Sequence, residues 1–381
     1  MIDRRTLVLG AGGALAATRA LASPFSHVGP QVALPTVSQA LRGVLQTSDA
    51  PAVGYAVIDA KGVSRLEVGG RRRSTAETPV GRDDAWHLGS NTEALTSAAY
   101  ARLVEARQAL WGVGVDFLFP DIKSHPDWRG ATIESFLSHR AGVSDLGLIN
   151  ADFFKAVNKD RRPLQIQRTD LVSKVLSAPP QGKPKDYEYA NLNYVIVGAA
   201  IERATRTTWE EAVDALVFKP LSLETAGFGA PYGDAPWGHE VGANGVVTPV
   251  DPADRLADNP PVLAPGGQAH MSLPDYAKFV HVFLSSGGGF LSPASLMRLA
   301  RPADAFSEGD AMGWRVTPAK AWAKGPVLAH EGSNTLWRAY AELAPARPLG
   351  LLVVTNVGGE PGARAVQLMS ARLMGEVARD D

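Results

Sequence analysis

The chain has 381 residues, of which 45% are hydrophobic and 20% are charged, so it is long enough to bury a large core and has the composition of an ordinary globular protein. Its formal net charge of −1 gives no support for binding to nucleic acid or to an anionic membrane surface. The absence of cysteine excludes disulfides, thiolate catalysis and cysteine-bound metals.

The first 22 residues have the layout of an export signal. Arg4 and Arg5 precede a short apolar run rich in glycine and alanine that ends near residues 20–22. The paired arginines suggest the twin-arginine route, and the apolar run is short for a membrane span. We therefore expect a cleaved signal peptide over residues 1–22 and a periplasmic protein, with a retained amino-terminal anchor as the alternative.

The next chemical signal is a serine at a predicted helix start. An apolar run ends at Gly89, and apolar residues from Leu95 to Leu103 follow at helical spacing. At a helix N-terminus, free N–H groups and the helix dipole favour a developing negative charge on Ser90. Glu93 lies one turn later on the same face, where the Ser-x-x-Lys acyl-transfer site has its lysine. Ser-x-x-Glu is also the sequence of a helix capping box, which remains the alternative.

The elements around this helix follow an α+β order. Strand patterns at residues 53–58 and 63–68 form a predicted hairpin, and strand patterns return at 313–316, 327–330, 337–343 and 349–355. Between them lie predicted helices at 132–139, 170–176, 191–204, 209–218 and 274–284, and an ordered loop at 227–267; a helix at 362–377 ends the chain. This order predicts one antiparallel sheet built from both chain ends and flanked by helices, with the active site in a crevice beside it.

Two further clusters carry groups suited to catalysis. Tyr189 and Asn191 lie two residues apart at a loop-to-helix junction, so both can reach one ligand, and a phenol can carry a proton. His330 and Gly332 follow a strand, and the glycine would let a substrate lie against the strand edge near the Ser333 N–H. The sequence has neither a zinc-binding His-Glu-x-x-His nor a Gly-x-Ser-x-Gly elbow, and nothing in it indicates a metal or an organic cofactor.

The chain resembles the class C β-lactamase, penicillin-binding-protein and D-aminopeptidase-like serine hydrolases over most of its length. The stretches that carry the resemblance are Leu88-Gly89-Ser90, Phe136-Leu137-Ser138-His139-Arg140-Ala141-Gly142-Val143, Tyr189-Ala190-Asn191, Ala264-Pro265-Gly266-Gly267, His330-Glu331-Gly332-Ser333 and Val353-Val354-Thr355-Asn356. The resemblance implies a β-lactamase/transpeptidase-like domain over residues 23–381, with 31–90 and 303–381 in an α/β lobe and 91–302 in a mainly helical lobe.

The resemblance also implies roles for the clustered residues. Ser90 would be the nucleophile, and Tyr189 would shuttle its proton. Asn191 would bind the substrate amide, and His330 would stand where many members carry lysine or histidine. The backbone N–H groups of Ser90 and Ser333 would form the oxyanion hole.

Glu93 departs from the family pattern, because it occupies the position of the catalytic lysine. A carboxylate about 4 Å from a developing alkoxide disfavours it by roughly 4 kcal/mol at an effective dielectric constant near 20. Each 1.4 kcal/mol is about a factor of ten in rate, so the lysine mechanism cannot be carried over unchanged. The missing cation should also raise the pKa of Tyr189.

Three interpretations of this departure stay open. Glu93 could be the general base for Ser90, with its pKa raised by burial. Lys183 or Lys185 could reach the site from the segment before Tyr189. The pocket could also bind without turnover, as a catalytically impaired β-lactamase-like protein that holds a ligand or an interaction partner.

We expect an active enzyme rather than a binding protein: a serine hydrolase that acts by acyl transfer on a small ester, amide or peptide. With Glu93 and Glu331 near the pocket, and only His330 and Arg338 as counter-charge, carboxylate-bearing β-lactams should bind poorly. Neutral esters or amides are the better predicted substrates. No nucleic-acid partner is expected, nor a stable membrane span once the signal is removed.

Overall fold

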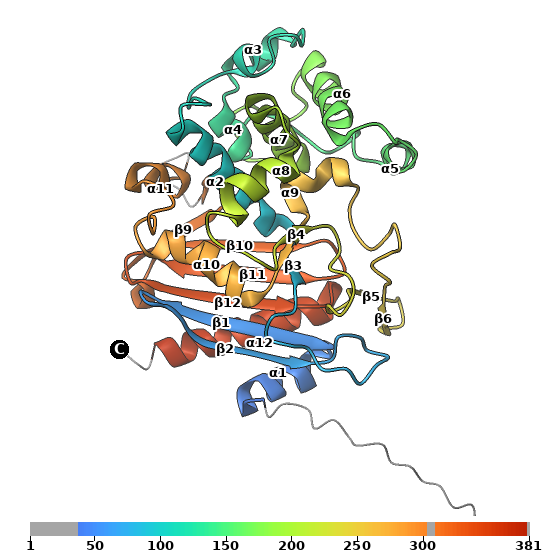
Figure 1. The fold of residues 1–381 in the computed structure, drawn as a ribbon, viewed down its shortest axis with the longest axis vertical. Helices are drawn as coiled ribbons and strands as arrows, with labels where there is room; N and C mark the ends of the chain where they lie inside the picture. Colours follow the sequence, from blue (N-terminus) through green and yellow to red (C-terminus); the bar gives the residue numbers. More distant parts are fainter. Residues whose placement is uncertain (1–36, 303–308, 379–381) are drawn as a thin grey trace, which may run out of the picture. The chain divides into compact units, whose positions relative to one another are not determined.

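Both ends of the chain contribute to one antiparallel sheet. In the computed structural model, which describes residues 37–302 and 309–378, seven strands pair in the order β2-β1-β12-β11-β10-β9-β8 (Figure 1). The strands are β1 (Ala52–Asp59), β2 (Gly62–Gly70), β8 (Gly309–Asp310), β9 (Arg315–Lys320), β10 (Gly325–Ser333), β11 (Arg338–Ala344) and β12 (Leu349–Thr355). The predicted α+β fold is therefore confirmed, whereas the predicted signal segment lies outside the described residues.

The predicted hairpin and the predicted central strand are both confirmed. β1 and β2 pair around a two-residue turn in which the Asp59 carboxylate accepts the Lys61 N–H at 2.7 Å. β12 pairs with β1 on one side and with β11 on the other, so all its backbone groups are shared inside the sheet. This position explains its nearly continuous apolar sequence, since a strand covered on both faces has no solvated side.

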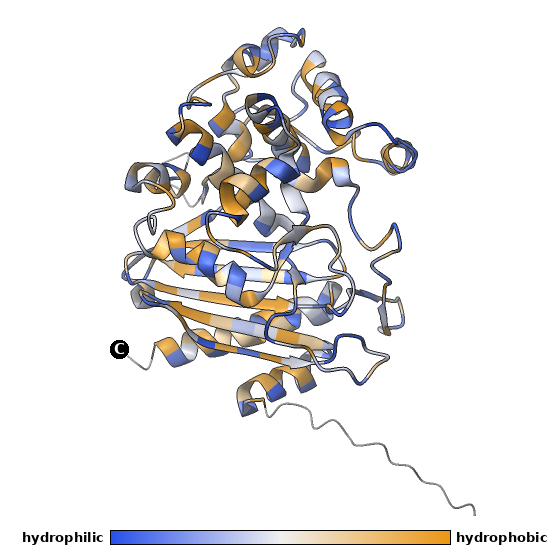
Figure 2. Ribbon diagram, viewed as in Figure 1, coloured by the Kyte–Doolittle hydropathy of each residue, from blue (hydrophilic) through white to orange (hydrophobic). Residues whose placement is uncertain are grey.

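Helices cover the two faces of the sheet. On one face, α12 (Gly359–Val377) packs on β12, whose Leu351 and Val353 belong to the smaller core, and α1 (Gln39–Ser48) packs on α12 and β2. On the other face, α10 (Leu273–Leu284) packs on the same strands, where Leu352 and Val354 belong to the larger core. This alternation along β12 follows the two-residue period of a strand. Figure 2 shows the apolar character of β1 and β12 between these layers.

The helical part surrounds α2 (Thr92–Glu105), which is buried over most of its length. The other helices there are α3 (Val115–Leu118), α4 (Ile133–Leu137), α5 (Ala151–Val157), α6 (Leu164–Ser177), α7 (Asn191–Thr205), α8 (Trp209–Val213), α9 (Ala264–Gly267) and α11 (Pro293–Leu299). Short helical turns are η1 (Gly89–Asn91), η2 (Pro126–Gly130), η3 (Asp214–Phe218), η4 (Pro261–Leu263) and η5 (Ala321–Ala323). No helix in the described ranges has the length and apolarity needed to cross a membrane.

Two features differ from the prediction. The segment 227–267 is not only a loop, because it contributes β4 (Gly227–Phe228), β5 (His239–Val241) and β6 (Val247–Pro249), of which β4 pairs with β7 (Ala269–Met271) beside β3 (Trp86–His87). Strands of two or three residues are too short to show a period of two. Helix α10, predicted within the helical lobe, packs against β1, β2, β11 and β12 instead. The two lobes are layers of one unit rather than separate domains.

Two buried histidines in these short strands are held in the neutral form. His239 donates from Nδ1 to the Asn356 carbonyl at 2.7 Å, and its Nε2 accepts the Ser74 N–H at 2.9 Å. His270 donates from Nδ1 to the Gly229 carbonyl at 2.8 Å. Burial is the main cause that lowers the pKa of each imidazole from 6.5 to about 4.

These pKa values predict a loss of stability in mild acid. Between about pH 6.5 and pH 4 the unfolded chain binds protons that the folded chain does not, so the free energy of unfolding should fall as the pH falls and then level off. The contribution is at most roughly 3 kcal/mol for each histidine. Urea denaturation across this range should show the decrease, and His239→Gln should reduce its slope. An identical pH profile for the variant would contradict the assignment.

Candidate active site

The hydroxyl of Ser90 faces the phenol of a residue that is far away in the sequence. Ser90 lies in η1, directly before α2, and its Oγ is 2.7 Å from the hydroxyl of Tyr189, which precedes α7. Helix α2 has no side-chain cap at its N-terminus, where the N-cap residue is Asn91. The capping-box alternative is therefore excluded, since neither Ser90 nor Glu93 closes its own helix end.

Glu93 is buried between two imidazoles. Its side chain is 1% exposed, and its Oε2 lies 3.1 Å from His139 Nε2 and 3.4 Å from His330 Nε2. The His139 Nδ1 accepts the Ala190 N–H at 3.3 Å, and a backbone N–H can only donate. This bonding assigns the proton of neutral His139 to Nε2, from which it is donated to Glu93.

The pKa of Glu93 is lowered, contrary to the general-base interpretation. Burial is the largest influence and acts to raise the pKa, as predicted, but His139 and His330 together outweigh it. The expectation of a raised pKa is wrong because it took account of desolvation and not of the two imidazoles. At neutral pH Glu93 is an ionised carboxylate that holds two rings in place.

Tyr189 has the raised pKa that the missing lysine predicted. Burial of the phenol is the main cause, and the charge of Glu93 is the next, so the pKa lies well above its ordinary value. The ring packs against His139 with centroids 4.6 Å apart. The phenol is therefore protonated at neutral pH, so it can accept the Ser90 proton only as it passes its own proton on.

The backbone beside Ser90 packs directly on strand β10. A Cβ atom on Gly332 would lie 2.5 Å from the Ser90 nitrogen and would also collide with the Leu88 carbonyl. A Cβ atom on Gly89, where φ is +52°, would lie 2.7 Å from the Gly332 carbonyl carbon and would meet the Ser333 nitrogen. Only glycine fits at both positions, and this close approach brings the Ser90 and Ser333 nitrogens to one place.

Asn191 is oriented by a carboxylate that the sequence analysis did not identify. Asp145 Oδ2 accepts both the backbone N–H and the side-chain amide of Asn191 at 2.8 Å, and its Oδ1 accepts the Leu192 N–H at 3.1 Å. Asp145 thereby caps α7 from another segment. The Asn191 Oδ1 faces Gly266 in α9, and the next residue, Gly267, lies beside Gly89.

A cavity of about 360 Å³ opens beside the phenol and the end of β10. Its lining comes from both layers of the fold: Tyr187, Tyr189, Asp310, Arg315, Ala329, His330, Glu331 and Tyr340. Burial raises the pKa of Asp310, which lies opposite Arg315 in the strand register. Glu331 forms an ion pair with Arg338. The cavity wall itself thus carries two carboxylates and one arginine.

No lysine replaces the missing cation in the described part of the chain. Lys183 is 83% exposed and pairs with Asp186 at 3.4 Å, and Lys185 is also exposed. Neither of them lines the cavity. Within residues 37–302 and 309–378, no group of three or more His, Asp or Glu side chains is arranged to hold a metal ion.

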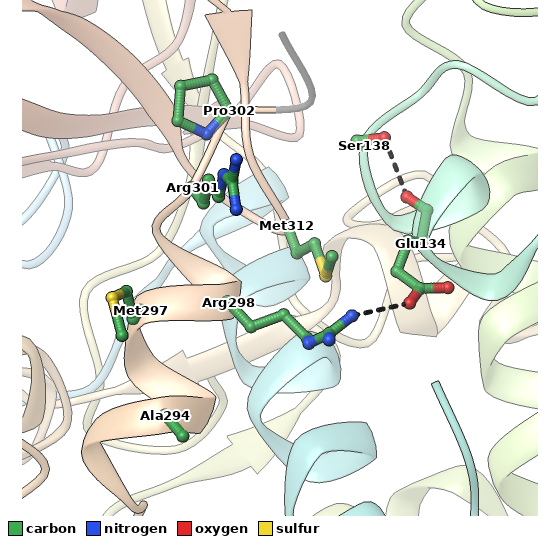
Figure 3. A pocket seen from close by; sticks show the side chains of 8 residues that line it. All are labelled: Glu134, Ser138, Ala294, Met297, Arg298, Arg301, Pro302 and Met312. Atoms are coloured by element: carbon green, nitrogen blue, oxygen red, sulfur yellow. Dashed lines mark hydrogen bonds and ion pairs between the residues drawn. The ribbon is translucent and has the colours of Figure 1, made fainter. Parts of the chain in front are cut away.

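A second cavity, of about 580 Å³, lies between α4 and α11 and contains none of these groups (Figure 3). Its walls include the ion pair between Arg298 and Glu134, whose atoms are 3.0 Å apart, and Ser138, whose hydroxyl donates to the Glu134 carbonyl. The volume alone does not mark it as the active site. The Ser90–Tyr189 pair and the imidazole–carboxylate cluster mark the cavity beside Tyr189 as the candidate active site.

The structure thus brings together all the residues that the sequence analysis singled out: Ser90, Glu93, Tyr189, Asn191, His330, Gly332 and Ser333. Their catalytic roles remain predictions. Sequence reasoning missed His139, Asp145, Asp310 and Arg315. His139 lay in a family-like stretch but was interpreted as a helix end, and the other three carried no local signal.

The family comparison agrees with this geometry. The Beta-lactamase family matches residues 37–375, so the chain belongs to the beta-lactamase family. A curated relative, the unguisins hydrolase ungD' of Aspergillus campestris, is 27% identical over 259 residues, which cover 64% of this chain and 46% of the relative. The chain therefore spans about half the length of that protein.

Solved structures share the fold. The penicillin-binding protein homologue from Pyrococcus abyssi aligns with a TM-score of 0.72 at 21% identity, over 87% of this chain and 76% of its own. The D-amino acid amidase from Ochrobactrum anthropi has a TM-score of 0.71 at 16% identity, over 90% and 99%. The class C beta lactamase from Rhodobacter sphaeroides has a TM-score of 0.68 at 17% identity, over 88% and 98%. The β-lactamase/transpeptidase-like fold is confirmed.

The close packing at Gly332 can be tested by adding a methyl group. Gly332→Ala should destabilise the protein by about 2–3 kcal/mol, because its Cβ would overlap backbone atoms that cannot move independently. Gly375→Ala is the control, since a Cβ there meets nothing within 4 Å inside α12, and it should stabilise by about 0.5–1 kcal/mol. Urea denaturation of both variants measures the difference. Equal stabilities would contradict the packing.

The charge of Glu93 can be tested through the phenol. Glu93→Gln should lower the pKa of Tyr189, because the carboxylate charge is the second cause of its elevation after burial. Ultraviolet titration of tyrosinate in Glu93→Gln, with Glu93→Gln/Tyr189→Phe subtracted, isolates the one phenol. The same difference between wild type and Tyr189→Phe is the reference. A transition at the same pH in both pairs would show that Glu93 does not act on Tyr189.

Proposed function

We propose that this chain is a serine hydrolase that acts by acyl transfer through Ser90 on a small neutral ester or amide. The observation that carries the proposal is the 2.7 Å contact between the Ser90 and Tyr189 hydroxyls at a helix start. Family membership and the adjoining cavity support it. The curated relative is itself named a hydrolase.

In the proposed acylation, the Ser90 oxygen attacks the carbonyl carbon of the substrate while its proton passes to the Tyr189 hydroxyl. As it accepts the Ser90 proton, the phenol passes its own proton to the leaving group, and the nearby Glu93 charge, which raises the pKa of Tyr189, disfavours a free phenolate. The backbone N–H groups of Ser90 and Ser333 stabilise the oxyanion. The carbon–leaving-group bond breaks as the leaving group takes this proton, and Tyr189 keeps the proton that came from Ser90, so it is again a neutral phenol. Water then cleaves the acyl-enzyme by the same route.

The two imidazoles partly compensate for the charge of Glu93, which stands where other members of the family carry lysine. A lone carboxylate near the alkoxide would cost roughly 4 kcal/mol, but Glu93 shares its charge with His139 and His330. The buried Nδ1 of His330 has no hydrogen-bond partner in the described chain. We assign to His330 the role of orienting Glu93 beside the cavity, because it borders both of them.

The charge pattern favours neutral substrates. Glu331 is paired with Arg338 and Glu93 with imidazoles, and Arg315 shares the cavity wall with Asp310, so these two arginines lie among three carboxylates. A substrate carboxylate would have to compete with these protein carboxylates for the two arginines. This supports an ester or amide without a charged group beside the scissile bond.

The alternative function is ligand binding without turnover. The observation that favours it is the lowered pKa of Glu93, which makes this carboxylate a weak base. A cavity that opens beside an ordered serine can hold a carbonyl ligand whether or not an acyl-enzyme forms. The two functions differ in whether Ser90 becomes covalently modified.

Intact-mass analysis after treatment with a fluorophosphonate probe distinguishes these functions. The wild type should gain one probe mass at Ser90, Ser90→Ala should gain none, and Tyr189→Phe should react about 10²–10⁴-fold more slowly because the proton carrier is lost. Glu93→Lys tests the alternative. Labelling that occurs only in Glu93→Lys, or in no variant, would establish the binding protein.

The substrate proposal predicts an order of turnover. A short-chain aryl ester should be hydrolysed with a higher kcat/KM than a cephalosporin, whose carboxylate would meet Asp310 and Glu331 in the cavity wall. Spectrophotometric assays of both substrates at the same ionic strength measure the ratio. Faster cephalosporin turnover would overturn the proposed substrate class.

A further inference from the structure

A second imidazole–carboxylate pair lies behind the Ser90 backbone. His87, in β3, has a fully buried side chain whose Nε2 is 2.8 Å from Asp258 Oδ2. Its ring stacks on Trp337, with centroids 5.5 Å apart. Neither His87 nor Asp258 lines the cavity beside Tyr189, and the proposed acyl transfer does not use them.

The bonding of His87 fixes its proton and ties it to the nucleophile's segment. The Gly89 N–H donates to His87 Nδ1 at 3.0 Å, so Nδ1 carries no proton. The ring proton is therefore on Nε2 and is donated to Asp258. Asp258 holds the tautomer that accepts the Gly89 N–H, one residue before Ser90.

The other carboxylate oxygen holds the opposite side of the predicted oxyanion hole. Asp258 Oδ1 accepts the side-chain amide of Asn334 at 3.0 Å, and Asn334 directly follows Ser333. The Asn334 Oδ1 in turn accepts the N–H groups of Leu336 and Trp337, both at 3.2 Å, so the turn after β10 is fixed as well. One carboxylate thus reaches the segments of Ser90 and Ser333 from one point.

We propose that Asp258 is a positioning residue that aligns the two backbone N–H donors of the oxyanion hole, through His87 on one side and Asn334 on the other. This inference rests on the proposed acyl-transfer function. The two donors must meet one developing oxygen, and a displacement of about 1 Å can cost on the order of 10²-fold in rate. A carboxylate that bonds to both segments limits their relative movement.

The cavity on the far side of Asp258 makes the role testable by chemical rescue. Asp258 borders a cavity of about 600 Å³ that also contains Asn259 and Gln268, and its side chain is 9% exposed. In Asp258→Ala, formate can enter this cavity and accept the hydrogen bonds of His87 and Asn334 that the lost carboxylate accepted. A contribution to folding alone would not restore the chemical step in the folded enzyme.

The experiment measures kcat and KM for a short-chain aryl ester in full-length wild type, Asp258→Ala and Asp258→Asn, with and without formate. Asp275→Ala is the matched control: Asp275 is also a buried carboxylate, it accepts the N–H and hydroxyl of Thr225, and it has no bond to the Ser90 or Ser333 segments. Thermal unfolding gives the folded fraction of each variant. The backbone amide NMR signals of Ser90 and Ser333 are recorded in the same proteins.

Asp258→Ala should lower kcat about 10–100-fold with KM changed less than about threefold, and formate should restore at least part of kcat. Asp258→Asn should be intermediate, since an amide can serve only one of the two donors. Asp275→Ala should lose stability but keep kcat per folded molecule. The Ser90 and Ser333 amide signals should shift in Asp258→Ala and not in Asp275→Ala.

Unchanged kcat in Asp258→Ala, or a loss that follows only the folded fraction and ignores formate, would overturn the positioning role. If wild type shows neither ester turnover nor fluorophosphonate labelling, the proposed function fails instead. The amide signals still decide the inference in that case. Unshifted Ser90 and Ser333 signals in Asp258→Ala would overturn it.

Discussion

The charge of Glu93 is the constraint on which the site depends. A carboxylate with 1% of its side chain exposed is stable only where other groups compensate for its lost hydration. Here His139 approaches from the end of α4, His330 from β10, and the Tyr189 ring lies against His139. The contacts that compensate for this one buried charge therefore join the helical layer to the sheet beside Ser90.

The segment around Ser90 is held from two directions, each time by a carboxylate that binds imidazole. On the side-chain side, Glu93 binds two imidazoles and sets the charge that Tyr189 experiences. On the backbone side, Asp258 binds His87, which accepts the N–H of Gly89. We propose that the Glu93 group sets the charge beside Tyr189 and that the Asp258 group sets the backbone geometry. Because Gly89 and Gly332 leave no space between η1 and β10, a change in either group is transmitted to the Ser90 backbone.

Glu93, which stands at the position of the family's lysine, is therefore not an isolated charge. His139 and His330 both contact its carboxylate, at 3.1 and 3.4 Å. His330 also lines the cavity, so the Glu93 carboxylate and its two partners lie beside any ligand that the cavity holds. Loss of activity is consequently not the automatic result of the Ser-x-x-Glu sequence.

Much of the fold could be predicted because local patterns determine it. The β1–β2 hairpin follows from two apolar runs around Asp59 and Lys61, and α7 from the helical spacing after Asn191. The path of 227–267 could not be predicted, because its strands are too short to show periodicity. The cap that Asp145 places on α7 was also inaccessible, since the two lie 46 residues apart and no spacing rule joins them.

By itself, the amino-acid sequence determined the elements, their order around one sheet, the family resemblance and the cluster of candidate residues. These depend on side-chain periodicity and on motifs only a few residues long. The tertiary structure decided that Glu93 pairs with imidazoles instead of capping its helix, and that its pKa is lowered instead of raised. The physical reason is that its partners lie 46 and 237 residues away in the chain, so their charge acts on the carboxylate only after folding has buried all three groups together.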